Sequence, residues 1–378
     1  MWLSATEALA RLGSKPQSLY ANVSRGRIRA RPDPVDSRRS LYSEEDVDRL
    51  ASRARGRRSA AVVASDAISW GDPVLPSAIS TVSGGRLYYR GVDAVELAET
   101  ATLEDVATLL WDGPWTMPAA ARRPAGPTPM AAAFATLAER AVSGTPSSEL
   151  GPWELRADAA GVLASFADAL LGGGSGPLHV RLAASLGRPE LADILRRALV
   201  LLADHELNTS TFAARVTVST GASLAAGALA GLAAFSGPLH GNAAAAVLAF
   251  AIDIGPQGAR APEALRDWLG EGRVIPGFGH RLYPRGDVRG EALLAAIDIP
   301  PNFRTLRAAG EKLVDERPNI DFALATMSAA YDLPRHAAST IFALARTVGW
   351  LAHMLEQAAT GELIRPRARY VGPAIRAR

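Results

Sequence analysis

The chain has 378 residues, with 41 Lys and Arg against 38 Asp and Glu, a formal net charge of +3 and no cysteine. The lack of cysteine excludes disulfides and thiolate metal sites, and 48% apolar with 21% charged residues is typical of a soluble globular protein. The longest apolar run, residues 243–252, is too short to span a bilayer, and the first residues lack the order of a signal peptide. We therefore expect a cytoplasmic protein with no membrane partner.

Positive charge is concentrated at the front of the chain. Residues 1–58 contain 13 Lys and Arg against 7 Asp and Glu, a net charge of +6, which leaves −3 for the remainder. This asymmetry suggests a module that faces nucleic acid, joined to a nearly neutral body. An arginine-rich solvated face is the alternative explanation.

The front region has the signals of three short helices, at residues 3–13, 14–28 and 42–55. Ser4 and Glu7 predict a capping box at the start of the first helix. The second helix is expected to begin at Ser14 and to end at Gly26. The third follows a serine and carries acidic residues in its first turn, where their negative charge interacts favourably with the helix dipole.

Residues 27–42 are basic and extended, as in a hairpin or wing. Two helices, a wing and a third helix resemble the MerR/excisionase-like winged helix-turn-helix family, which implies a domain over 1–58 whose second helix reads the major groove. The side chains that would meet bases or phosphates are Gln17, Ser18, Tyr20, Asn22, Arg25, Arg27, Arg29, Arg38 and Arg39. A domain kept for protein contacts or subunit packing is the alternative.

The body of the chain is predicted to be almost all helix. Apolar residues recur at spacings of three and four in residues 103–113, 157–172, 189–207 and 304–317. Residues 78–91 alternate around Gly84 and Gly85, the one clear hairpin signal. Residues 122–129 and 143–152 are expected to be surface loops.

The pentapeptide SGPLH occurs twice and places His179 and His240 in the same short context. His240 is followed by Gly241 and a run of small residues, so it is expected at a helix N-terminus, where the dipole favours a neutral ring able to donate to a developing oxyanion. His179 is followed by an ordinary amphipathic helix and is expected to be a surface or capping residue. His280 lies in a Gly- and Pro-rich loop whose backbone could approach a ligand.

Further polar residues interrupt apolar segments. Arg281, Arg285 and Arg289 predict an anion-binding loop. His205 suggests a structural network or part of a polar pocket, and Arg346 needs an anionic partner within its apolar helix. Asp321 lies at the start of an apolar helix. By this position alone, an N-cap is a more common role for it than a catalytic base.

These residues suggest a pocket for a small polycarboxylate without defining a reaction. No metal is expected, because no ligand cluster has suitable spacing, and no phosphate-binding glycine motif is present.

Seven segments, in order, resemble the citrate synthase family: residues 85–113, 203–222, 236–247, 276–289, 318–325, 342–357 and 364–373. The likeness spans roughly residues 68–375. It implies a mainly α, two-domain body after the helix-turn-helix domain, with a large domain over 59–240 and 329–378 and a small domain over 241–328. It also implies a homodimer with shared active sites.

The resemblance assigns catalysis to three side chains. Asp321 would remove a methyl proton from acetyl-CoA, His240 would stabilise the enolate and His280 would act on the ketone of oxaloacetate. Oxaloacetate or citrate would be bound by His205, Arg289 and Arg346, and by Arg365 from the other subunit.

The resemblance assigns CoA to the loop residues Pro276, Gly277, Phe278, Gly279 and Arg285. Acetyl-CoA is then a substrate, and no cofactor is implied. Two positions depart from the family pattern: Asn242 replaces the usual Gly, and Val288 the usual Pro, but neither removes a catalytic residue.

Three functions follow as hypotheses. The first is a citrate synthase that condenses acetyl-CoA with oxaloacetate and hydrolyses the thioester. The second is a 2-methylcitrate synthase that uses propionyl-CoA. Both hypotheses stay open, because one methylene contributes only ~1–3 kcal/mol to the discrimination between two acyl groups. The third, from another class, is a metabolite-sensing DNA-binding regulator with a synthase-like body.

Overall fold

The computed structural model describes residues 2–34, 36, 39–54, 75–118, 126–238, 240–241, 243–366, 368 and 370–373. Within 52–54 it describes the backbone alone. The expected domain end at residue 58, Arg38 and Asn242 lie outside the described residues. No helix in these ranges is both long and apolar enough to cross a membrane.

Residues 2–54, here called the N-terminal unit, contain three helices and a small antiparallel sheet of order β1-β3-β2. The elements are β1 (Trp2–Leu3), α1 (Ala5–Leu12), α2 (Pro16–Ser24), β2 (Ala30–Pro32), β3 (Ser40–Ser43) and α3 (Glu44–Ala54). Their apolar faces form a core separate from that of the body, made of Leu3, Ala8, Leu19, Val23, Ile28, Tyr42 and Val47.

Local capping explains where the first helices begin. The Ser4–Glu7 capping box is confirmed, since Ser4 N–H donates to Glu7 Oε2 at 2.8 Å and Glu7 N–H donates to Ser4 Oγ at 3.3 Å. The predicted Ser14 cap of α2 is wrong: Lys15 is the N-cap and Pro16 takes the first turn. Proline is preorganised for that position because its φ is already helical and it has no N–H to leave unpaired.

Within the described residues, the first elements of the body are those of the predicted hairpin, in which β4 pairs with β5 around Gly84 and Gly85, both at positive φ. The strands are β4 (Ser80–Ser83), β5 (Arg86–Tyr89) and β6 (Val92–Asp93). The helices of the first part are α5 (Ala94–Thr100), α6 (Leu103–Leu110), α7 (Pro129–Ser143), η1 (Ser147–Glu149), α8 (Pro152–Leu171), α9 (Leu178–Ser185), η2 (Pro189–Leu191), α10 (Ala192–Leu202), α11 (Thr209–Val218) and α12 (Leu224–Phe235). The remaining helices are α13 (Ala243–Asp253), α14 (Ala261–Gly270), α15 (Val288–Ala295), α16 (Pro301–Val314), α17 (Ile320–Ala330) and α18 (Ala337–Thr360).

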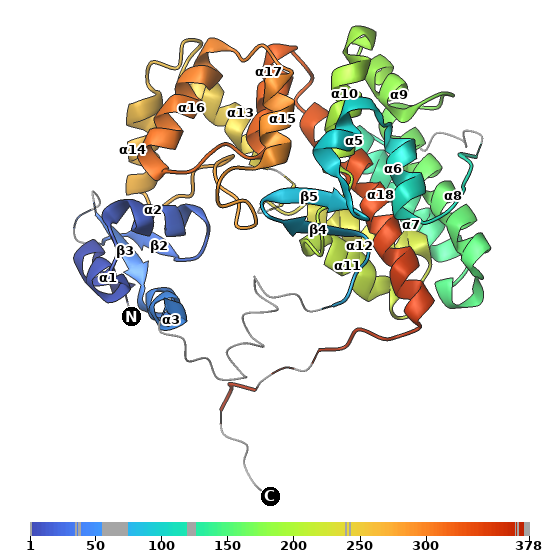
Figure 1. Cartoon of the computed structure of the whole chain (residues 1–378), viewed down its shortest axis with the longest axis horizontal. Coiled ribbons are helices and arrows are strands. Elements are labelled where there is room, and N and C mark those ends of the chain that lie inside the picture. Colours follow the sequence, from blue (N-terminus) through green and yellow to red (C-terminus); the bar gives the residue numbers. More distant parts are fainter. Residues whose placement is uncertain are drawn as a thin grey trace, which may run out of the picture.

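Helix α18 is the axis of the body. It contacts α6, α8, α10, α11, α12, α13 and α17, and one continuous apolar core joins the helices around it. In Figure 1, α13 to α17 form a group on the left of the body, α5 to α12 surround α18 on the right, and the β4–β5 hairpin lies between them. The mainly helical prediction is therefore confirmed.

The close approach of α18 to the end of α10 depends on a glycine. Gly349 N–H donates to Ala203 O at 3.1 Å across the helix pair. A Cβ at position 349 would lie 2.4 Å from Ala203 O and 2.3 Å from Asp204 Oδ1. This contact brings α18 against the segment that carries His205.

We expect Gly349→Ala to lower the free energy of unfolding by about 1–3 kcal/mol, because the added methyl must displace a buried backbone. The matched control is Gly270→Ala at the end of α14, where nothing lies within 4 Å of the new carbon. Urea unfolding measures both variants. Equal stability of the two variants would contradict this account of the helix contact.

Candidate functional site

A buried aromatic cluster forms one wall of the site. His205 follows α10, and its Nε2 lies 3.0 Å from the hydroxyl of Tyr283. The ring of His280 lies 4.9 Å from that of His205, centroid to centroid, and the guanidinium of Arg289 lies over the Tyr283 ring at 5.3 Å. Tyr283 is a site residue that the sequence did not single out.

Asp287 organises the next part of the site. Its carboxylate caps α15, accepting from Arg289 N–H at 3.1 Å and from Arg289 Nε and Nη2 at 2.9 and 2.8 Å. It also accepts from the N–H of Ile320, at the start of α17, at 3.1 Å. Burial would raise the pKa of Asp287, but the neighbouring Arg289 holds it below its ordinary value. The pair therefore stays charged and joins two helix N-termini.

Asp321 lies in the first turn of α17, and Asn319, rather than Asp321, is the N-cap. Asn319 Oδ1 accepts from Asp321 N–H at 3.0 Å, which leaves the Asp321 carboxylate without a capping role. Burial raises the pKa of Asp321 to about 6, against the opposing effect of Arg289. Its residual exposure and raised pKa are typical of a carboxylate that can accept a proton near neutral pH.

His240 lies in the turn before α13, as predicted. Its Nε2 is 2.8 Å from the Ser210 hydroxyl, which in turn accepts from Trp350 Nε1 at 3.1 Å. Phe235 packs edge-on to the ring at 5.7 Å. Burial, with Arg346 as the second cause, lowers the pKa of His240 to about 4, so the ring is neutral at physiological pH.

Arg346 is a buried cation of α18 with unused hydrogen-bonding capacity. Its side chain is 1% exposed, and Nε donates to Leu202 O at 3.0 Å. Its Nη2 is buried and has no hydrogen-bond partner among the described residues. Burial lowers its pKa to about 10, which still leaves it charged, and Asp204 and Asp321 act on it electrostatically. The anionic partner expected from the sequence can therefore be a ligand.

The loop before α15 is fixed to the segment before α17. Gly279 N–H donates to Arg317 O at 2.9 Å, and Asn319 N–H donates to Gly277 O at 2.8 Å. Gly277 and Gly279 adopt positive φ, and a Cβ at either would collide with neighbouring atoms. The side chain of Phe278 is buried against Phe322, so this residue offers a ligand its backbone alone.

His280 closes the loop next to the aromatic cluster. Leu282 N–H donates to His280 Nδ1 at 3.1 Å, so the proton of the neutral ring resides on Nε2. Burial, followed by Arg289, lowers its pKa to about 4. Burial likewise lowers the pKa of His205 well below its ordinary value. The site thus contains three neutral imidazoles, two guanidiniums and two carboxyl groups, of which Asp287 is paired with Arg289 and Asp321 is not hydrogen-bonded to either arginine.

Some of the predicted residues lie elsewhere. Arg281 donates to Arg25 O in the N-terminal unit at 3.0 Å, and exposed Arg285 donates to Gly84 O in the hairpin at 3.2 Å. Arg365 is exposed in the segment after α18, which runs away from the body in Figure 1. Among the described residues, no three His, Asp or Glu side chains form a group suited to a metal ion.

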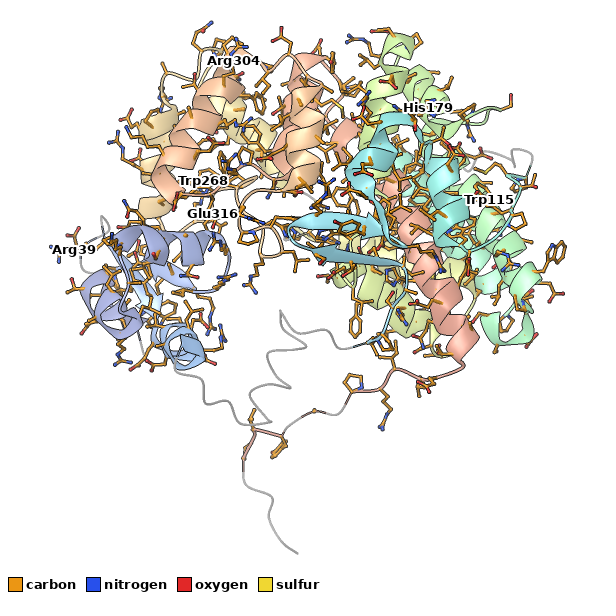
Figure 2. All side chains as sticks on the ribbon, in the orientation of Figure 1. Arg39, Trp115, His179, Trp268, Arg304 and Glu316 are labelled. Carbon is orange, nitrogen blue, oxygen red and sulfur yellow. The ribbon has the colours of Figure 1, made fainter. Side chains whose placement is uncertain are left out.

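His179 occupies the other SGPLH copy, in the first turn of α9. It is half-buried, and its charged neighbours are Glu104, Arg196 and Asp193. Figure 2 shows it near the top of the α5–α9 half of the body. Its surroundings contrast with those of His240, whose ring contacts Ser210, Phe235 and Phe342.

The comparisons with known proteins agree with this architecture. The family model described as "Citrate synthase, C-terminal domain" matches residues 69–169 and 119–367, and the chain belongs to the citrate synthase family. The citrate synthase of Thermotoga maritima is 28% identical, covers 81% of this chain and 96% of its own, and superposes with a TM-score of 0.63. The citrate synthase of the archaeon Thermoplasma acidophilum, solved with carboxymethyl coenzyme A and oxaloacetate, is 26% identical, covers 81% and 95%, and superposes with a TM-score of 0.67.

Curated relatives match over a shorter stretch. Citrate synthase 2 of Bacillus subtilis is 37% identical over 195 residues, 49% of this chain and 52% of the relative. The 2-methylcitrate synthase of Mycobacterium tuberculosis is 36% identical over 198 residues, 49% of this chain and 50% of the relative. The chain thus spans about half the length of these relatives. The family match begins at residue 69, so the N-terminal unit lies outside it.

The raised pKa of Asp321 has a consequence for stability. The Asp321 carboxyl group binds its proton more tightly in the folded than in the unfolded state. The free energy of unfolding therefore falls as the pH rises from the ordinary pKa of an aspartate through about 6. We expect the stability advantage of Asp321→Asn over the wild type to grow by about 1–2 kcal/mol between pH 4.5 and 7.5. Urea unfolding at both values measures it, and a pH-independent difference would contradict the assignment.

Proposed function

We propose that the protein is a citrate synthase-type enzyme that condenses an acyl-CoA with oxaloacetate and hydrolyses the resulting thioester. The observation that carries the proposal is the convergence of a raised-pKa carboxylate, Asp321, with two buried arginines, one of which has an unpartnered nitrogen. Membership of the family supports the same reaction, as does the likeness to the Thermoplasma acidophilum enzyme, whose structure contains a CoA derivative and oxaloacetate.

Oxaloacetate is a dicarboxylate, and the candidate site offers two guanidiniums. Arg289 and Arg346 are both nearly fully buried, so a carboxylate beside them is attracted in a medium of low dielectric constant. Asp287 already neutralises Arg289, whereas Nη2 of Arg346 lacks a partner among the described residues. We assign one substrate carboxylate to each arginine and the carbonyl region to His205 and His280.

The proton transfers follow from the protonation states. Asp321 accepts a proton from the carbon next to the thioester carbonyl, and the neutral His240 ring donates a hydrogen bond to the oxygen that gains charge. The enolate carbon then forms a bond to the ketone carbon of oxaloacetate, while His280 Nε2–H donates a hydrogen bond to the ketone oxygen as it gains charge. That oxygen takes up one proton and becomes a hydroxyl, and the proton that Asp321 removed from the acyl carbon closes the balance. Water finally cleaves the thioester, which releases CoA and the tricarboxylate.

The acyl-CoA is expected at the loop 276–280, whose backbone would meet the adenine, with Arg285 near the phosphates. Acetyl-CoA and propionyl-CoA differ by one methylene, and the curated relatives include both synthase types. Comparison of kcat/KM for the two acyl-CoAs on the full chain distinguishes citrate from 2-methylcitrate synthesis. No cofactor is assigned.

The assembly is part of the proposal. Arg365 is exposed and outside the site of its own chain, which fits a residue that enters the site of a second copy in a homodimer. The family resemblance also supports a large domain over 59–240 and 329–378 and a small domain over 241–328. Closure of one over the other would exclude water from the thioester.

A DNA-binding regulator is the weaker candidate. Gln17, Ser18 and Tyr20 of α2 are exposed, as base contacts require. Arg25, however, is paired with Glu316 of the body, so it is not available to phosphate in this arrangement. A sensor also has no need for a base such as Asp321.

We expect Asp321→Ala to reduce turnover by about 10²–10⁴-fold or more, because the weak carbon acid loses its base, while oxaloacetate binding survives. A thiol-release assay with acetyl-CoA and oxaloacetate measures turnover, and calorimetry measures binding. Loss of oxaloacetate binding in a folded variant would show that Asp321 is structural. Absence of activity in the folded wild-type dimer would overturn the proposed function.

Arg346→Met should weaken oxaloacetate binding by about 30-fold or more, because a buried charge partner is removed. Its melting temperature should be unchanged or higher, since the free protein no longer buries an incompletely paired charge. Arg196→Met is the matched control: Arg196 is also buried but donates to the carbonyls of Ala98, Glu99 and Ala101. That variant should lose stability and keep its affinity for oxaloacetate, and the opposite pattern would contradict the assignment.

A further inference from the structure

The end of α2 and the turn that follows it, where the sequence predicted phosphate contacts, lie against the body. Helix α2 contacts α16, and Figure 1 shows the N-terminal unit below α14 and α16. Ser40 Oγ donates to Gly270 O at 2.9 Å, and a Cβ on Gly272 would lie 3.2 Å from the carbonyl carbon of Ala30. The wing and α14 are therefore in direct contact.

The ion pair between Arg25 and Glu316 is the charged centre of this interface. The Glu316 side chain is 3% exposed and that of Arg25 21% exposed, so the pair is largely removed from water. Figure 2 shows Glu316 at the junction between the N-terminal unit and the group α13–α17. A carboxylate buried in this way requires a cationic partner, and the N-terminal unit supplies it.

Glu316 also touches the loop assigned to the acyl-CoA. A Cβ on Gly279 would collide with Glu316 Oε2, which means that the carboxylate lies directly on the backbone of this residue. The backbone carbonyl of the next residue, Arg317, accepts a hydrogen bond from Gly279 N–H at 2.9 Å. The position of Glu316 and the path of the loop are therefore coupled.

A second connection reaches the same loop from its other end. Arg281, directly after His280, donates from Nε to the carbonyl oxygen of Arg25 at 3.0 Å. One residue of the N-terminal unit thus holds the loop through its side chain, by way of Glu316, and through its backbone, by way of Arg281. A nucleic acid approaching this turn would meet the body instead of a free basic surface.

We propose that the N-terminal unit is an intramolecular support for the acyl-CoA site and that Arg25, acting through Glu316, is a positioning residue for the loop 276–280. The proposal rests on the proposed function, because it takes this loop as the place where CoA binds. It assigns the α2 turn to the body of the same chain rather than to DNA.

The test measures the affinity of the full-length protein for CoA by calorimetry, which requires no turnover. Arg25→Ala and Glu316→Gln should each weaken CoA binding and raise KM for acyl-CoA about 5- to 20-fold, with the oxaloacetate affinity changed less than about twofold. The double variant should lose no more than the worse single variant, because both remove the same contact.

Arg11→Ala is the matched control. Arg11 pairs with Glu44 and Asp48 inside the N-terminal unit and has no part in the contacts with the body described above. This variant should bind CoA like the wild type. Circular dichroism and melting temperatures establish that each variant is folded.

The outcomes separate this proposal from the proposed function. If the wild type binds CoA and condenses acetyl-CoA with oxaloacetate, but Arg25→Ala and Glu316→Gln bind CoA as tightly as the wild type, Arg25 is merely structural and the proposal fails alone. If the wild type neither binds CoA nor turns over, both fail. Salt-sensitive retardation of duplex DNA by the wild type that Arg25→Ala abolishes, with CoA affinity unchanged, would assign the turn to DNA instead.

Discussion

The geometry of the site depends on one buried carboxylate. Asp287 accepts four N–H groups, three from Arg289 and one from Ile320, at distances of 2.8–3.1 Å. These bonds set the start of α15, the guanidinium of Arg289 and the start of α17 relative to one another. Asp321 follows Ile320 directly, so its place opposite the arginines is a consequence of the same contact. Removal of either Asp287 or Arg289 would leave the other as a buried charge without compensation.

Burial raises the pKa of the acid Asp321 and lowers the pKa of the histidines of this site, and the proposed chemistry uses both effects. It makes Asp321 a stronger base than an ordinary aspartate and keeps His240 and His280 neutral, so that they can donate hydrogen bonds without carrying charge. Arg346 remains charged despite the same burial. The site thus combines fixed positive charge with neutral donors, as the proposed reaction requires for a dicarboxylate beside a developing enolate.

The sequence was most informative where the signal is local. Helix periodicity, the Gly84–Gly85 hairpin and the turn before α13 required neighbouring residues alone, and the structure has them where they were expected. The cap of α2 was misplaced because Pro16 competes with Ser14 for the helix start. The position of Asp321 at a helix start fits a capping residue equally well, and the structure assigns that role to Asn319.

Contacts between distant segments could not be predicted. Ser210 and Tyr283 support His240 and His205 across 30 and 78 residues of chain, and a lone Ser or Tyr in a helical sequence carries no sign of such a partner. The basic segment around Arg25 suggests a contact with phosphate, whereas Glu316, its partner in the structure, is remote in sequence. A match between the charge of the front region and an acidic residue of the body was the one signal available, and it is too unspecific to identify the pair.

The central claim is that the two buried arginines, Arg289 and Arg346, bind the two carboxylates of one ligand. Calorimetric titration of the full chain with oxaloacetate and, in parallel, with pyruvate tests it most directly, because pyruvate has the keto acid and lacks the second carboxylate. We expect one oxaloacetate to bind per chain, about tenfold or more tightly than pyruvate. Equal affinity for the two ligands, or no binding of oxaloacetate at millimolar concentration, would contradict the account.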